Sequence, residues 1–99
     1  MINTNYLGEY DEAGNLYARA LLIRRKQYGD RHPMVATTLN NLGLQFKKQK
    51  KFDEALPLYQ EALSIRREVY GNYHEEVAAS LNNLVVPAQI SITSFAIDS

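Results

Sequence analysis

The 99-residue sequence predicts an all-α fold: a solenoid of helical hairpins with about four helices, a truncated array. Two observations lead to this prediction. Segment 10–42 recurs 42 residues later as segment 52–84, and more than half of the aligned positions are identical. Within each unit, apolar residues return at helical spacing, and glycine or proline marks the segment boundaries. The helices are expected over residues 9–28, 33–50, 53–70 and 75–86.

The helix expected over 33–50 has its apolar residues at i, i+3, i+4 and i+7, which places them on one helical face. Pro33 suits the first helical turn, where its missing backbone N–H is no loss. The residues of this face are Leu39, Leu42, Gly43 and Phe46.

The helix expected over 53–70 begins with Asp53, whose carboxylate is a good N-cap. Pro57 falls within about the first turn, where proline costs little. Gly29 and Gly71 follow equivalent helices and are expected to end them as left-handed C-cap residues. The predicted buried stripe includes alanines, which allow a neighbouring helix to come close: Ala55, Leu58, Tyr59, Ala62, Ile65 and Val69.

This pattern resembles the tetratricopeptide repeat. The resemblance covers about residues 9–84 and rests on Leu39, Leu42, Gly43, Phe46, Ala55, Tyr59 and Ala62. The unit is longer than the usual ~34 residues of this repeat. Its Leu-Asn-Asn-Leu, Ala-Leu-x-Ile-Arg and Tyr-Gly-x-x-His segments are similar to the kinesin light chain type of repeat.

The resemblance divides the chain into three parts. Residues 1–8 are expected to be a remnant of a preceding repeat helix, with Gly8 in the loop between paired helices. Residues 9–84 hold the repeats, and residues 85–99 form a divergent tail of low order. At the loop position equivalent to Gly8 the later unit has Lys50, which costs about 1 kcal/mol if its backbone is left-handed.

The resemblance also implies a concave groove that binds an extended peptide through asparagines on the first helix of each repeat. An amide offers both a donor and an acceptor to a peptide backbone. In the open alternative, these asparagines only bond neighbouring repeats together. The lysines either attract an acidic peptide or are a solvated helix end. The predicted peptide-binding residues are Asn40, Asn41, Leu44, Lys47, Lys48, Asn82 and Asn83.

The expected function is therefore non-enzymatic protein–protein interaction. By resemblance, the module binds a cargo or adaptor peptide, and its parent protein connects to the kinesin heavy chain. Such a protein is expected in the cytoplasm, in association with the cytoskeleton. Two alternatives remain open: a general tetratricopeptide scaffold unrelated to motors, and a truncated vestigial fragment.

Composition argues against other classes of protein. Eleven basic and eleven acidic residues give zero net charge, whereas nucleic-acid binders usually carry a basic excess. No apolar run is long enough to span a membrane, and no cysteine is present. No catalytic, cofactor or metal site is expected, since His32 and His74 occupy equivalent loop positions suited to capping or loop packing. The solvated outer side of the second helices is expected to carry Arg24, Arg25, Arg66 and Arg67.

Overall fold

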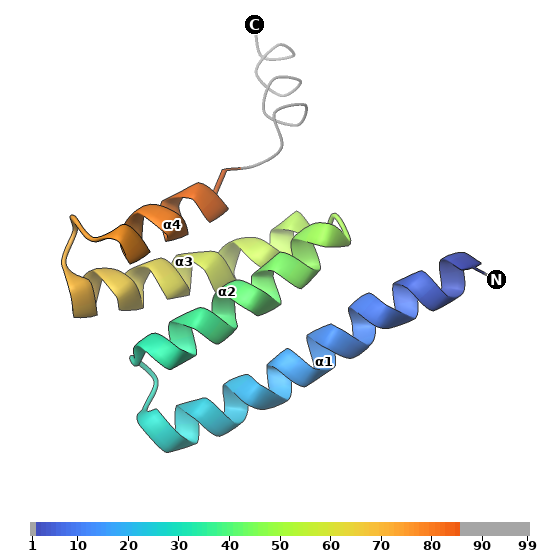
Figure 1. Cartoon of the computed structure of the whole chain (residues 1–99), viewed down its shortest axis with the longest axis horizontal. Helices are drawn as coiled ribbons and strands as arrows, with labels where there is room; N and C mark the ends of the chain where they lie inside the picture. The colour runs from blue at the N-terminus through green and yellow to red at the C-terminus, as the bar shows by residue number, and fades with distance from the viewer. Residues whose placement is uncertain (1, 86–99) are drawn as a thin grey trace, which may run out of the picture.

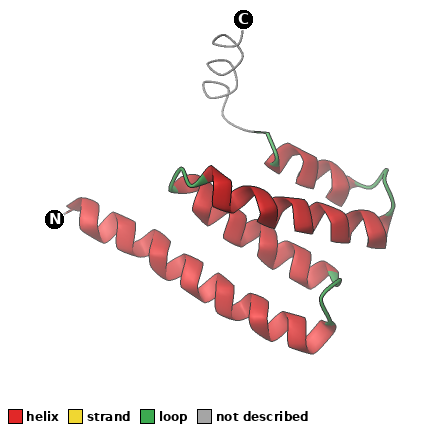
Figure 2. Cartoon of the chain, turned by 180° about the vertical axis from the view of Figure 1, so that it is seen from behind, coloured by secondary structure: helices red, strands yellow, loops and turns green. Residues whose placement is uncertain are grey.

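The computed structural model describes the backbone of residues 2–85 and the side chains of residues 12–85. Within this range every regular element is an α-helix, which confirms the all-α prediction (Figure 2). The predicted tail, apart from Val85, lies outside the described residues. The helices are α1 (Ile2–Tyr28), α2 (Pro33–Lys48), α3 (Phe52–Tyr70) and α4 (Glu75–Asn83).

Consecutive helices run antiparallel and pack on one another in chain order (Figure 1). The contact between α2 and α3 is the most extensive, and α1 and α4 lie on opposite sides of this pair. This arrangement follows from short connections, which bring sequential helices side by side as hairpins.

The core lies where α2 meets α3. Leu39, Ala62 and Ile65 were expected there from the helical stripes, whereas Val35 and Ala36 were not part of the predicted stripe of α2. Leu21 of α1 and Leu58 of α3 pack against this cluster from its edges. Val69 was expected in the stripe but is 45% exposed, because it lies in the last turn of α3, past the buried residues. The cluster consists of Val35, Ala36, Leu39, Ala62 and Ile65.

The N-terminal boundary of α1 differs from the expectation. The helix begins at Ile2 and continues through Gly8, so the predicted loop at Gly8 is wrong. A glycine inside a helix costs only about 1 kcal/mol relative to alanine, so flanking helical residues can carry the helix across it.

Three further helix ends differ from the prediction. Helix α2 ends at Lys48 rather than at residue 50. Helix α3 begins one residue before Asp53, and its N-cap is Lys51, without a capping side-chain hydrogen bond. Asp53 instead lies in the first turn, where its charge favours the helix dipole. Pro57 consequently falls beyond the first turn, with its side chain exposed. Helix α4 ends at Asn83 rather than near residue 86.

Histidine side chains cap the two helices that follow the glycine connections, as predicted. His32 Nδ1 accepts a hydrogen bond from the Met34 backbone N–H at 3.0 Å. His74 Nδ1 accepts one from the Glu76 backbone N–H, also at 3.0 Å. Each imidazole stacks on the tyrosine four residues earlier, with ring centroids 4.4 and 4.3 Å apart. The Tyr-Gly-x-x-His segment is thus a structural connection in both units.

The glycines of these connections have the positive φ that was predicted. Gly29 has φ 93° and Gly71 has φ 86°. At Gly71 the ψ angle is 173°, so the residue adopts an extended conformation at positive φ rather than the left-handed helical one. Residues with a Cβ atom almost never adopt that region.

Lys50 occupies the left-handed region, with φ 63°. We expect Lys50→Gly to raise the free energy of unfolding by about 1 kcal/mol, because glycine lacks the Cβ atom that makes positive φ costly. The matched control is Lys48→Gly inside the last turn of α2, which should lower stability by about 1 kcal/mol. Urea denaturation followed by circular dichroism measures both; destabilisation by Lys50→Gly would contradict the expectation.

Candidate peptide-binding surface

One side of α2 faces solvent and carries three of the predicted peptide-binding residues. Asn41, Leu44 and Lys48 are spaced i, i+3 and i+7, so they form a stripe along the helix. Asn41 is half-buried, Lys48 is exposed, and Leu44 exposes 41% of its surface. On α4 the residue equivalent to Asn41 is Asn83, also half-buried. We call these four residues the front surface.

A hollow of about 270 Å³ adjoins the front surface where the end of α2, the start of α3 and the end of α4 meet. Its wall is largely apolar and includes Leu56 and Tyr59. Polar groups reach it from Lys47, Asp53 and Asn83. Two predicted residues, Lys47 and Asn83, therefore line the same concavity although they come from different helices.

Tyr59 lines the hollow and carries a hydroxyl that is itself buried. Its side chain is 3% exposed, and its buried hydroxyl has no hydrogen-bond partner among the described residues. Desolvation by burial raises the pKa of Tyr59, since the phenolate would be poorly solvated there. The hydroxyl therefore stays protonated at neutral pH and keeps both its donor and its acceptor capacity.

The end of α2 is strongly basic. Lys47 and Lys48 lie in its last turn, and Lys50 and Lys51 follow directly. None of the ion pairs found within residues 12–85 involves these lysines. Asp53 is the acidic residue at the hollow itself. The surface at the end of α2 thus favours a ligand with acidic groups.

Asn40 is not open to a ligand, which corrects its assignment to the binding surface. It is 9% exposed and faces the guanidinium group of Arg66. Because a guanidinium offers only donors, the amide oxygen of Asn40 is the atom that accepts, at 3.1 Å from Arg66 Nη2. The alternative in which such asparagines hold the stack together is therefore the one that applies to Asn40.

Arg66 itself connects three helices. Its side chain is buried, its Nη1 donates to Ser80 Oγ at 2.9 Å, and its Nη2 lies 3.4 Å from Glu76 Oε1. The earlier unit repeats this contact, since Arg24 Nη1 donates to Thr38 Oγ1 at 2.6 Å. The expectation that these arginines lie on a solvated outer side is wrong.

A sequence signal could have revealed this contact: a residue with a hydroxyl group follows each of these arginines fourteen positions later, Thr38 after Arg24 and Ser80 after Arg66.

The arginines next to these two, Arg25 and Arg67, differ from each other. Arg25 Nη2 pairs with Glu61 Oε2 at 3.1 Å, whereas Arg67 is exposed, as expected.

Asn82 is the repeat equivalent of Asn40 and is exposed on α4. Because Asn82 follows Asn40 by one repeat, it lies on the face of α4 that is equivalent to the face of α2 on which Asn40 lies. That face points away from the front surface. The predicted residues therefore separate into three groups. Asn41, Leu44, Lys48 and Asn83 form the front surface; Lys47 joins Asn83 at the hollow; Asn40 and Asn82 belong to the sides where repeats meet.

Two kinds of structure are absent from the described residues. No helix there is both long and apolar enough to cross a membrane. No group of three or more histidine, cysteine, aspartate or glutamate side chains within that range is placed to hold a metal ion.

Comparison with known proteins identifies the repeat. The model of the tetratricopeptide repeat family matches the chain twice, over residues 3–46 and 35–85. A search of curated proteins found no match. The two family matches span most of the chain and coincide with the four helices. Repeats of this family generally mediate protein–protein interaction and are typically non-enzymatic. The chain belongs to the tetratricopeptide repeat family.

Proposed function

We propose that this chain binds an acidic peptide in extended conformation along its front surface. The observation that carries the proposal is the position of Asn41, Leu44 and Lys48 on one exposed stripe of α2, with the equivalent Asn83 on α4. A protein–protein interaction module needs such a surface, in which polar groups are available and apolar area is uncovered.

Each part of this surface suits a different part of the peptide. The amides of Asn41 and Asn83 can donate to and accept from the peptide backbone regardless of its sequence. The two amides lie on different helices, α2 and α4, so a peptide that contacts both must extend from one helix to the other. Leu44 offers apolar contact, and Lys48 attracts acidic side chains.

The hollow suits one large side chain of the peptide. Its volume of about 270 Å³ lies below the ~300–1,000 Å³ typical of small-molecule sites. Its apolar wall, with Leu56 and Tyr59, favours an aromatic or aliphatic group. Lys47, Asp53 and Asn83 in its lining favour a side chain with a polar end, such as that of a tyrosine or tryptophan.

The parent protein remains a separate proposal. The 42-residue unit and the Tyr-Gly-x-x-His connection favour the kinesin light chain type, and a cytoplasmic protein that carries cargo on a motor. The stacking and capping contacts of that connection would serve a general tetratricopeptide scaffold equally well. Peptide binding at the front surface is common to both identities.

The test is fluorescence anisotropy with a labelled acidic peptide that contains one aromatic residue. We expect an affinity of ~10 μM or weaker, because the surface is short and the peptide must be ordered on binding. Asn41→Ala combined with Asn83→Ala should weaken binding by about tenfold at any salt concentration, since hydrogen bonds worth about 0.5–1.5 kcal/mol each are lost.

Two controls separate the contributions. Lys47→Glu with Lys48→Glu should weaken acidic peptides more than a neutral one, and salt should reduce that difference by screening. Asn82→Ala, an exposed asparagine away from the front surface, should leave affinity unchanged. If Asn41 and Asn83 can be replaced without loss of affinity while helix content is intact, the front surface is not the binding site.

A further inference from the structure

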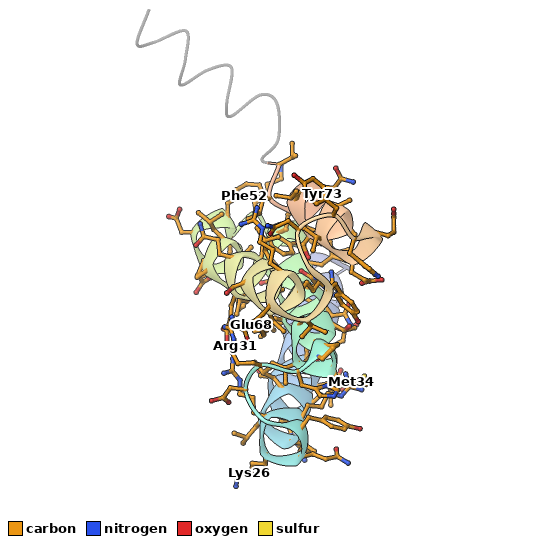
Figure 3. The ribbon with its side chains drawn as sticks, turned by 90° about the vertical axis from the view of Figure 1, so that its left-hand side faces the viewer. Lys26, Arg31, Met34, Phe52, Glu68 and Tyr73 are labelled. Carbon is orange, nitrogen blue, oxygen red and sulfur yellow. The ribbon has the colours of Figure 1, made fainter. Side chains whose placement is uncertain are left out.

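Two apolar faces are uncovered at opposite ends of the stack of helices. The N-terminal face, on α1, consists of Leu16, Leu22 and Ile23, which expose 57%, 60% and 61% of their surfaces. The C-terminal face consists of Tyr73, Ala78 and Leu81; Tyr73 is fully exposed and Leu81 is 45% exposed. In Figure 3 Tyr73 lies at one end of the molecule and Lys26 of α1 at the other.

The internal repeat shows what these faces are built to contact. Ile23 is equivalent to Ile65, and Leu81 is equivalent to Leu39; both equivalents are 0% exposed. Ile65 of α3 and Leu39 of α2 belong to the same core cluster. The two uncovered faces therefore correspond to the two halves of the contact that α3 and α2 make within this chain.

We propose that a second molecule of this chain covers each face, in a head-to-tail arrangement. The α1 helix of one molecule packs on α4 of the next as α3 packs on α2. Ile23 of one molecule then enters the shallow hollow of about 320 Å³ that Tyr73, Val77, Ala78 and Leu81 line on the other. The pair of helices formed across the interface has the order of a repeat, with α4 as its first helix and α1 of the second molecule as its second.

A contact between the connection that precedes α2 and helix α3 supports the same register. Arg31 Nη2 donates to Ser64 Oγ at 2.6 Å and pairs with Glu68 Oε2 at 2.9 Å. Figure 3 shows Arg31 and Glu68 beside each other. At the proposed interface the equivalent of Arg31 is Tyr73, and the equivalents of Ser64 and Glu68 are Leu22 and Lys26 of the second molecule. At the interface, Tyr73 would therefore make an apolar contact with Leu22 and a cation–π contact with Lys26 of the second molecule. The Tyr73 side chain is available for both, because it is fully exposed in the single chain.

One pair of charges opposes the association. Arg25 pairs with Glu61 at 3.1 Å within the chain. The equivalent pair across the interface is Arg67 with Arg19 of the second molecule, both exposed. Two positive charges thus face each other at the interface, where the α2–α3 contact within the chain has an ion pair. The interface is therefore weaker than the α2–α3 contact, and its strength depends on the charge at these two positions.

The N-terminal and C-terminal faces are different surfaces, so each added molecule leaves one of each uncovered. Such an interface does not close into a symmetric dimer but continues into longer chains of molecules. The mass of the assembly should therefore rise steadily with concentration.

Sedimentation velocity of the full 99-residue chain over a range of concentrations tests the proposal. The average mass should rise past that of two molecules at high concentration. Ile23→Asp and Leu81→Asp should each limit this growth to the monomer, while Leu44→Asp, an equally exposed leucine on the front surface, should not. Circular dichroism confirms that the variants keep their helix content.

Mixing provides the sharper test, because each variant keeps one intact face. Ile23→Asp retains the C-terminal face and Leu81→Asp retains the N-terminal face, so an equimolar mixture should form a dimer with one molecule of each. Arg19→Glu should strengthen association of the otherwise unchanged chain by about three- to tenfold, by replacing repulsion with an ion pair. The double variant with Arg19→Glu and Arg67→Glu should lose this increase in affinity, because two negative charges then face each other.

A chain that stays monomeric at high concentration overturns the proposal. So does a closed dimer, association that Ile23→Asp leaves intact, or a mixture of the two aspartate variants that remains monomeric.

Discussion

Gly43→Ala should lower the free energy of unfolding by about 1–3 kcal/mol, although alanine is the better helix former. A Cβ atom at Gly43 would lie 2.9 Å from Cε1 of the Tyr59 ring, closer than carbon atoms can approach. Tyr59 is 3% exposed and cannot swing into solvent, so α2 and α3 would have to separate. The glycine is required by the close approach of these helices.

The matched control is Gly14→Ala in α1, where an added Cβ atom meets nothing within 4 Å. That substitution should raise stability by about 0.5–1 kcal/mol, because only helix propensity changes. Urea denaturation of both variants should give effects of opposite sign. If Gly43→Ala instead raised stability, the Tyr59 ring would have moved away from the added Cβ atom at little cost. The expectation of a clash between α2 and α3 would then be wrong.

The Gly43 variant also connects packing with function. Tyr59 lines the hollow beside the front surface, so a displaced ring changes the shape of that hollow. If the peptide places a large side chain there, Gly43→Ala should weaken peptide binding more than its loss of stability explains. Gly14→Ala should leave binding unchanged.

Arg66→Ala should lower the free energy of unfolding by about 2–3 kcal/mol, since hydrogen bonds to a charged group contribute about 1.5–3 kcal/mol each. Removal of the guanidinium leaves the amide of Asn40 and the hydroxyl of Ser80 without their partner in the interior. Glu76 is 45% exposed and can regain water, which keeps the effect below that of a fully buried ion pair.

The effect should concentrate in α4, which packs mainly on α3. Amide hydrogen exchange in α4 should accelerate more than exchange in α2, because the lost contacts hold α4 to its neighbour. Arg67→Ala, the exposed neighbour on the same helix, should stay within about 0.5 kcal/mol of the wild type. Equal effects of the two substitutions would show that Arg66 is not the connection between α3 and α4.

Much of the fold followed from the sequence because its determinants are local. The spacing of Leu39, Leu42 and Phe46 predicts one helical face, whatever that face later contacts. The helix end at Gly71 and the capping of Glu76 by His74 depend on residues a few positions apart, and both were predicted correctly. The left-handed helical conformation expected of Gly71 was wrong, since its ψ angle is 173°. The repeat itself predicted that the same contacts would occur twice.

The wrong predictions about which polar side chains are open to solvent concern residues whose neighbours come from another helix. Periodicity places Asn40 and Asn41 on adjoining faces of one helix, but it does not reveal which face a neighbouring helix covers. The packed helices bring Arg66 against Asn40, while Asn41 faces outward. Likewise, the sequence predicted a solvated Arg66, whereas the structure places its guanidinium group against Ser80 and Glu76 of α4.

The sequence by itself therefore determined the helices, most of their ends and the repeat that relates them, because backbone hydrogen bonds and caps act within a few residues. Only the tertiary structure decided which polar residues hold the stack together and which remain open to a ligand. That distinction depends on desolvation, and a side chain is desolvated by whatever helix packs over it rather than by its neighbours in the chain.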